Sequence, residues 1–266
     1  MTPTTIELLK KKPKPPQSST PSFAKTGWHE ELVTQPDGTI AIVWTPLTEA
    51  DFLHPREGDH LPTNTFHDRM VTMLKDLLSR WFGHQPHTRV FSDLLIKWDL
   101  NLGDHSPDIF VTFDLQDPER DRSTFVVAKE GVRPALIFEV VSSRYRRADR
   151  KTKVRHYARA KVQEYIILDR RKYRGQIREE VIGYHQVTPG IYEAIVPDDQ
   201  GRILSQVAGL WISLQNGQLV LENAATGERL LSAWELEQRA EQERQRAEKL
   251  AAYLRSQGID PDTIEI

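Results

Sequence analysis

Cysteine is absent from the 266 residues of this chain, so neither a disulfide nor a thiolate metal site can form. That absence fits a reducing cytoplasm. No uninterrupted apolar run approaches the roughly 20 residues that a membrane-spanning helix needs. The N-terminal segment also lacks the apolar core of a signal peptide, because the lysine-rich stretch from Lys10 to Lys14 is followed by Pro, Gln and Ser. We therefore expect a cytoplasmic protein with no membrane partner.

A strong net charge is missing as well. The formal net charge of −2 and the 28% of charged residues describe an ordinary soluble surface, so any affinity for nucleic acid must come from local clusters. The length allows one domain of about 200 residues with appendages. We predict a disordered Pro/Lys-rich tail over residues 1–25, one folded domain over 26–222, and a charged C-terminal helix over 223–266.

The hydrophobic pattern predicts an α/β protein. It indicates a strand at 39–45 and an amphipathic helix that begins at Thr63 or Asn64 and ends at Gly83. The elements expected after it are strands near 89–98, 107–114 and 135–142, a helix over 148–161, and strands at 164–169, 176–187 and 191–196. The strand at 164–169 follows directly from a helix, which predicts a parallel crossover connection inside the sheet.

The C-terminal region is rich in Glu, Arg, Gln and Ala. Apolar residues recur there at heptad-like spacing, although Glu243 interrupts them; they are Ala233, Leu236, Ala240, Ala247, Leu250 and Leu254. About three heptads is the lower limit for a coiled coil. We predict a solvated helix that either forms a homodimer or folds onto the domain, and a final segment, 258–266, that caps the helix and frays.

One carboxylate stands in the middle of an apolar strand. Glu139 lies within Ala135-Leu-Ile-Phe-Glu-Val-Val-Ser142, where an ionised group is costly to desolvate unless a metal ion or a cation binds it. Asp108 opens another predicted strand, and Lys153 follows on a basic helix. The structural alternative is that Glu139 pairs with a buried Arg or Lys, that Asp108 only forms a turn, and that Lys153 is solvated.

Two carboxylates and a lysine are the groups that metal-assisted phosphodiester cleavage needs. Magnesium prefers hard oxygen ligands and keeps several waters, so Asp108, Glu139 and the backbone carbonyl of Val140 would suffice, and Mn²⁺ would fit the same donors. A lysine can orient the attacking water or bind the phosphate, and we assign that role to Lys153. Asp149 and Tyr157 share its helical face, four residues to either side.

The helix that carries Lys153 is strongly basic. Its charges are nearly all positive from Arg144 to Lys161, with Asp149 as the one acid, whereas a solvated helix normally mixes both signs. This asymmetry favours a face that binds a polyanion. The residues that we expect to hold the backbone of duplex DNA are Arg144, Arg146, Arg147 and Lys151. Such contacts would position a duplex without reading its sequence.

The segment that contains these residues resembles the Uma2 family, also called DUF820, of PD-(D/E)XK-type endonucleases. The resemblance covers roughly residues 60–215 and is carried by Pro107-Asp108, Phe138-Glu139-Val140-Val141-Ser142, Asp149-x-x-x-Lys153-x-x-x-Tyr157-Ala158 and Glu164-Tyr165. It implies a restriction-endonuclease-like core of helix, three strands, helix and strand, with extra strands and a C-terminal helix added. It also implies Mg²⁺-dependent DNA cleavage, with Asp108 and Glu139 as the matching acids.

The chain departs from the family pattern at a few positions. Val141 stands where the general Glu-x-Lys motif has its lysine, and the resemblance implies that this lysine has moved to the following helix, which fits Lys153. Ser143, Lys161 and Ile166 replace the Pro, Gly and Trp that are usual in the family. His67 also matches a family position, with no role assigned to it.

These observations together favour an Mg²⁺-dependent endonuclease that hydrolyses DNA. Two other classes stay open. One is a DNA-binding protein on the same fold without turnover, and the other is an interaction adaptor that acts through its C-terminal helix. Plasmid cleavage with Mg²⁺ separates the enzyme from the binding protein, whereas deletion after about residue 222, compared with Asp108→Ala, tests the adaptor.

Overall fold

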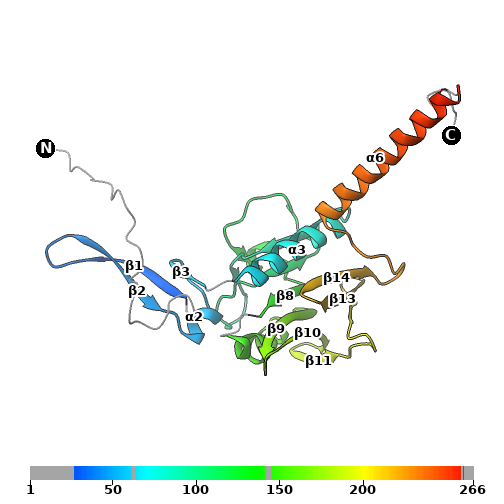
Figure 1. The fold of residues 1–266 in the computed structure, drawn as a ribbon. Coiled ribbons are helices and arrows are strands. Elements are labelled where there is room, and N and C mark those ends of the chain that lie inside the picture. The colour runs from blue at the N-terminus through cyan, green and yellow to red at the C-terminus, as the bar shows by residue number, and fades with distance from the viewer. Residues whose placement is uncertain (1–26, 62–63, 142–144, 259, 261–266) are drawn as a thin grey trace. The chain divides into compact units, whose positions relative to one another are not determined.

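A computed structural model describes residues 27–61, 64–141, 145–258 and 260 (Figure 1). They belong to two compact units, one before and one after the boundary between residues 62 and 63. The predicted tail over 1–25, the predicted phosphate contact Arg144 and most of the final segment lie outside the described residues. The predicted domain limits at residues 25 and 222 stay a prediction.

The first unit is a small antiparallel sheet with strand order β2-β1-β3. Strands β1 (Trp28–Thr34) and β2 (Ile40–Pro46) form a hairpin, and β3 (Asp59–His60) pairs with the start of β1. β2 confirms the strand that the sequence predicts at 39–45. Helix α2 (Glu49–Leu53) begins at Thr48, whose side chain and that of Asp51 form a capping box.

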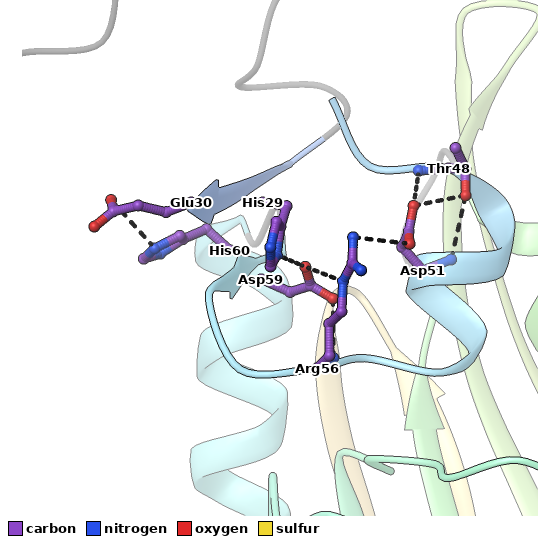
Figure 2. A network of polar contacts seen from close by, with 7 residues as sticks. All are labelled: His29, Glu30, Thr48, Asp51, Arg56, Asp59 and His60. Carbon is purple, nitrogen blue, oxygen red and sulfur yellow. Dashed lines mark hydrogen bonds and ion pairs between the residues drawn. The ribbon is translucent and has the colours of Figure 1, made fainter. Parts of the chain in front are cut away.

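Polar contacts hold the connections of this unit together, as Figure 2 shows. The side chain of Asp59 is only 1% exposed, and its Oδ1 lies 2.7 Å from His29 Nδ1. Its other oxygen accepts a hydrogen bond from the backbone N–H of Arg56 at 2.9 Å. The ring of His60 stacks on Trp28 with 4.9 Å between centroids. Because few apolar side chains are buried here, these contacts fix the turn that returns the chain to β1.

The second unit is built on a six-stranded sheet with the order β11-β10-β9-β8-β6-β4. Its strands are β4 (Arg89–Ser92), β6 (Ile109–Thr112), β8 (Leu136–Val140), β9 (Glu164–Tyr173), β10 (Gln176–Thr188) and β11 (Ile191–Ile195). β8 and β9 are parallel and every other neighbouring pair is antiparallel. The parallel crossover predicted for the strand at 164–169 is confirmed, and so are the α/β class and the order of helix, strands, helix and strand.

Helix α3 (Thr65–Trp81) covers one face of this sheet. The side chain of Asn64 accepts hydrogen bonds from the backbone N–H groups of Phe66 and His67, which satisfies two donors of the first turn. Apolar residues at helical spacing then pack on the alternate inward residues of β6, β8 and β9; they are Met70, Leu74, Leu77 and Leu78. The predicted amphipathic helix is confirmed.

The opposite face of the sheet is covered by the connection between β8 and β9. It contains a π-helical turn, η1 (Ala148–Thr152), that continues directly into α5 (Lys153–Arg159). Tyr157 from α5 packs with Phe110, Ile137 and Tyr165 in a second core cluster on this face. Since strand residues alternate between the two faces, each strand contributes to both clusters.

Several elements differ from the expectation. The strand predicted at 89–98 is interrupted at Asp93, whose φ of +50° ends β4, and β5 (Ile96–Lys97) pairs instead with β7 (Phe125–Val126). Helix α4 (Val127–Glu130) follows β7. A three-stranded sheet that the sequence did not predict consists of β12 (Ile203–Ser205), β13 (Leu210–Gln215) and β14 (Gln218–Asn223). Its inward residues complete the core beside α3.

The C-terminal helix α6 (Ala233–Ser256) starts about ten residues later than the composition change suggests. Ser232 and Glu235 form a capping box at its start, and none of its side chains is buried. Figure 1 shows it as a single continuous helix. Among the described residues, no helix combines the length and the apolar character that a membrane span requires.

Glu164 joins the central strand β9 to the added sheet. Its carboxylate accepts hydrogen bonds from Ser205 Oγ at 2.5 Å, from the Gln206 N–H at 2.8 Å and from the Val207 N–H at 3.2 Å. Glu164→Ala leaves these donors without their acceptor, so we expect the free energy of unfolding to fall by about 2 kcal/mol. Urea denaturation checks this. The exposed Glu193→Ala should change stability by less than about 0.5 kcal/mol; equal effects would contradict the role of Glu164.

Candidate active site

Asp108 and Glu139 face each other across two neighbouring strands. β6 and β8 pair with Ile109 opposite Phe138, so the next position along this antiparallel register sets Asp108 opposite Glu139. The alternation of the strands directs both carboxylates to the face that α5 covers. The backbone N–H of Val140 donates a hydrogen bond of 2.6 Å to Asp108 Oδ2. Two acids that are 31 positions apart in the sequence therefore lie side by side.

The helical connection brings three further polar side chains to these acids. Lys153 Nζ lies 2.9 Å from Glu139 Oε1 and 2.9 Å from Asp149 Oδ1. Tyr157 donates a hydrogen bond of 2.9 Å from its hydroxyl to Glu139 Oε1. Asp149, Lys153 and Tyr157 follow one another at four-residue intervals, and the π-helical turn keeps them on one buried face. The structure thus brings Lys153 together with Glu139, and its role stays a prediction.

Burial controls the electrostatics of the cluster. The side chains of Glu139 and Lys153 are only 3% and 5% exposed. Burial raises the pKa of Glu139 to about 8, since the attraction of Lys153 only partly offsets desolvation and the charge of Asp108 adds to it. Burial alone would lower the pKa of Lys153, but Asp149 and Glu139 raise it above its usual value. Lys153 is therefore an ammonium ion at neutral pH.

The cluster has more negative than positive partners. Glu139 and Asp149 each form an ion pair with Lys153, the charge of Asp108 also raises the pKa of Lys153, and burial raises the pKa of Asp149 as well. Both oxygens of Asp149 are buried and accept no hydrogen bond within the described part of the chain, although one pairs with Lys153. An added cation would favour the ionised forms of these buried carboxyl groups, and the oxygen donors suit Mg²⁺ or Mn²⁺.

A complete protein cage for a metal is not present among the described residues, where no three His, Asp or Glu side chains are arranged to hold one ion. Magnesium does not need such a cage, because it commonly takes one or two carboxylates and keeps its waters. Asp108 and Glu139, with the Val140 carbonyl as the predicted third ligand, fit that pattern. The donor set is compatible with the predicted cofactor.

Two more residues adjoin Asp108. His67 Nε2, from the first turn of α3, lies 3.1 Å from Asp108 Oδ1. Burial lowers the pKa of His67, but the hydrogen bond and charge of Asp108 outweigh it and raise this pKa above its usual value. Ser92 of β4 pairs with Ile109 of β6, so the next position along this antiparallel register sets Asp93 beside Asp108. Glu139 lies on the opposite side of Asp108, on β8. Burial and the charge of Asp108 raise the pKa of Asp93.

Asp93 was not predicted as a site residue. In the sequence it falls inside a run that looks like one continuous strand. Only its left-handed backbone conformation, with φ of +50°, shows that the strand ends there and that Asp93 reaches the position beside Asp108. Asp tolerates this region better than most residues, but nothing in a single sequence marks which Asp adopts it.

The predicted DNA-contacting residues differ in whether acids of the protein already bind them. Arg146 and Arg150 each lie 2.6 Å from Asp169 Oδ2, and Arg150 also lies 2.6 Å from Glu180 Oε2. The guanidinium of Arg146 is thus engaged by acids of the protein itself. Arg147 and Lys151 are exposed on the outer side of the same connection. Arg150 was not among the predicted contacts, and the DNA-binding roles assigned to Arg146, Arg147 and Lys151 stay predictions.

Comparison with known proteins places this geometry in a family. The sequence profile of Uma2, described as "Putative restriction endonuclease", matches residues 60–216. No curated protein matches the chain significantly. A solved structure from Anabaena variabilis ATCC 29413, titled as a putative nuclease belonging to DUF820, is similar with 14% identity and a TM-score of 0.39, over 55% of this chain and 80% of that one. Because the profile covers more than half of the chain and every residue of the cluster, this protein belongs to the Uma2 family.

Proposed function

We propose that this protein is an endonuclease that hydrolyses DNA phosphodiester bonds with the help of Mg²⁺. The observation that supports the proposal most is that Asp108 and Glu139 lie side by side on one face of the sheet, with Lys153 within reach of them. Membership in a family of restriction-endonuclease type supports the same reaction class.

Each residue of the cluster has a defined part in this proposal. Asp108, Glu139 and the Val140 carbonyl would hold the metal, which when bound activates water and stabilises charge on the leaving oxygen. Lys153, held as an ammonium ion, would orient the attacking water and stabilise the phosphate charge that develops. The hydrogen bonds from the Val140 N–H to Asp108 and from Tyr157 to Glu139 fix the two carboxylates in place.

A plasmid assay tests the activity directly. Supercoiled plasmid is incubated with the full chain in Mg²⁺, in Mn²⁺ and in EDTA, and relaxed or linear products are resolved on a gel. We expect products with either metal and none in EDTA. Tight DNA binding without any product would instead favour the nuclease-fold binding protein.

Metal binding can be tested without measuring activity. Mg²⁺ should raise the melting temperature of the metal-free chain, because a ligand at 100 times its dissociation constant stabilises the folded state by about 2.7 kcal/mol. Asp108→Asn should lose this shift, as seen by scanning calorimetry. Asp114→Asn is the matched control, since Asp114 is exposed six positions further along. An equal shift in Asp108→Asn would remove Asp108 from the metal site.

A homodimer through α6 is also part of the proposal. The helix leaves Leu236 and Leu250 exposed at 42% and 58%, on the seam that the heptad-like spacing predicts. Paired copies would supply two active sites, as cutting both strands of a duplex requires. Leu250→Glu should then convert a dimer to a monomer in analytical ultracentrifugation, and a wild-type monomer would refute the pairing. The adaptor hypothesis would require this helix, rather than Asp108, for function.

A further inference from the structure

A row of basic side chains runs along the outside of the η1–α5 connection. Arg147, Lys151, Arg155 and Arg159 follow one another at four-residue intervals, and all four are exposed. None of the four forms an ion pair with any residue that the structure describes. We call these residues the outer basic row.

The outer basic row lies on the far side of the helix from the acidic cluster. Asp149, Lys153 and Tyr157 lie two residues away from its members in sequence, and all three are buried against the sheet. Two residues correspond to roughly half a helical turn, so the two sets point in opposite directions. The row therefore cannot contact the phosphate that Lys153 would contact, and it forms a separate surface.

The row differs from other exposed helix cations in the charges around it. On α6, Arg239 pairs with Glu243 and Arg244 with Glu248, and Arg246 and Lys249, which form no ion pair within the described chain, share that helix with several glutamates. On the same connection, Arg146 and Arg150 are held by Asp169 and Glu180. Acids are thus available to basic residues nearby, yet the outer row is left with its charge open to solvent.

Helix electrostatics does not account for the row. A cation near the C-terminal end of a helix, such as Arg159, gains up to about 1 kcal/mol from the macrodipole. Arg147 stands at the N-terminal end of the connection, where a positive charge is disfavoured. Four like charges on one face also repel one another. A bound polyanion that neutralises all four charges would remove both their mutual repulsion and the unfavourable position of Arg147.

We propose that the outer basic row binds the phosphodiester backbone of a nucleic acid duplex outside the cleavage site. This inference rests on the proposed function, in which nucleic acid is the substrate, and it adds a second protein surface that contacts that substrate. Members spaced by about 6 Å extend over about 18 Å, and duplex DNA carries one negative charge per roughly 1.7 Å of its axis. Such contacts hold a duplex regardless of sequence and keep it near the enzyme.

Duplex affinity in EDTA tests the proposal, because cleavage cannot occur there. A fluorescent duplex of about 20 base pairs is titrated with the full chain from about 50 to 200 mM salt, the range over which backbone contacts are lost. Removing two contacts in Arg155→Gln/Arg159→Gln should lower affinity about tenfold or more and reduce the slope of log affinity against log salt by about 1.8.

The matched control removes the same charge from another exposed helix. Arg246→Gln/Lys249→Gln lies on α6 and should leave both affinity and slope unchanged. Equal losses in the two double variants, an unchanged slope in the row variant, or a wild type that binds phosphatidylserine vesicles but not the duplex would overturn the proposal. If the wild type nicks no plasmid but the row variant still loses duplex affinity, the endonuclease proposal is wrong and the outer basic row is still a binding surface for the duplex.

Discussion

Glu139→Gln should abolish plasmid cleavage while leaving the protein folded. The substitution removes one of two carboxylates proposed to hold the metal, and a metal ion contributes several kcal/mol to the transition state. Each 1.36 kcal/mol is a tenfold change, so we expect a loss of at least about 10³-fold in the rate of nicking. The measurement is the initial rate of conversion of supercoiled to relaxed plasmid in Mg²⁺.

The fold should tolerate this change. Glutamine keeps an oxygen for the hydrogen bond from Tyr157, and it replaces a buried carboxyl group whose pKa burial raises to about 8 with a neutral amide. Lys153 keeps Asp149 as its partner at 2.9 Å. Glu193→Gln is the control for an exposed glutamate and should cleave at the wild-type rate. Full activity in Glu139→Gln would exclude this carboxylate from the reaction and end the nuclease proposal in its present form.

Lys153→Met should destabilise the protein strongly, by about 3–5 kcal/mol in the free energy of unfolding. Methionine fills a similar volume but carries no charge, so Glu139 and Asp149 lose the cation that lies 2.9 Å from each of them. Removing one partner of a buried ion pair leaves an uncompensated charge, which is the costly case. Urea denaturation of the full chain measures the loss.

Lys151→Met is the matched control for this prediction. Lys151 is two residues away on the same connection but is exposed, so its loss should change stability by less than about 0.5 kcal/mol. Adding Asp149→Asn to Lys153→Met removes one orphaned carboxylate and should restore part of the stability. A loss below about 1 kcal/mol in Lys153→Met would mean that Lys153 is not the counter-ion of the cluster.

The elements that the sequence predicts well are those with a strong local signal. Helix α3 combines an Asn64 cap with apolar residues at three- and four-residue spacing, so both its position and its buried face follow from the sequence. β8 and the first half of β9 are short apolar runs on either side of a helix, which predicts their parallel pairing. The strand that carries Glu139 is recognisable for the same reason.

The elements that the sequence did not predict depend on contacts that are distant along the chain. β12, β13 and β14 are short, and their inward residues, such as Ile203, Leu210 and Leu221, become a core only when they pack beside α3. The break at Asp93 is a single backbone conformation inside an apolar run. Local propensity does not separate such a break from a continuous strand, because the pairing of Ile96 with Phe125 decides it.

For the site, the sequence by itself predicts which chemical groups this protein would use. A carboxylate inside an apolar strand is costly enough that Glu139 stands out without any coordinates, and the basic helix after it points to a counter-ion and a polyanion. What only tertiary structure decided is which cation serves which purpose. Folding buries Lys153 between Glu139 and Asp149, ties Arg146 and Arg150 to Asp169, and leaves Arg147 and Lys151 in solvent. Charges that look alike along the chain differ because the sheet covers one side of the helix and water covers the other.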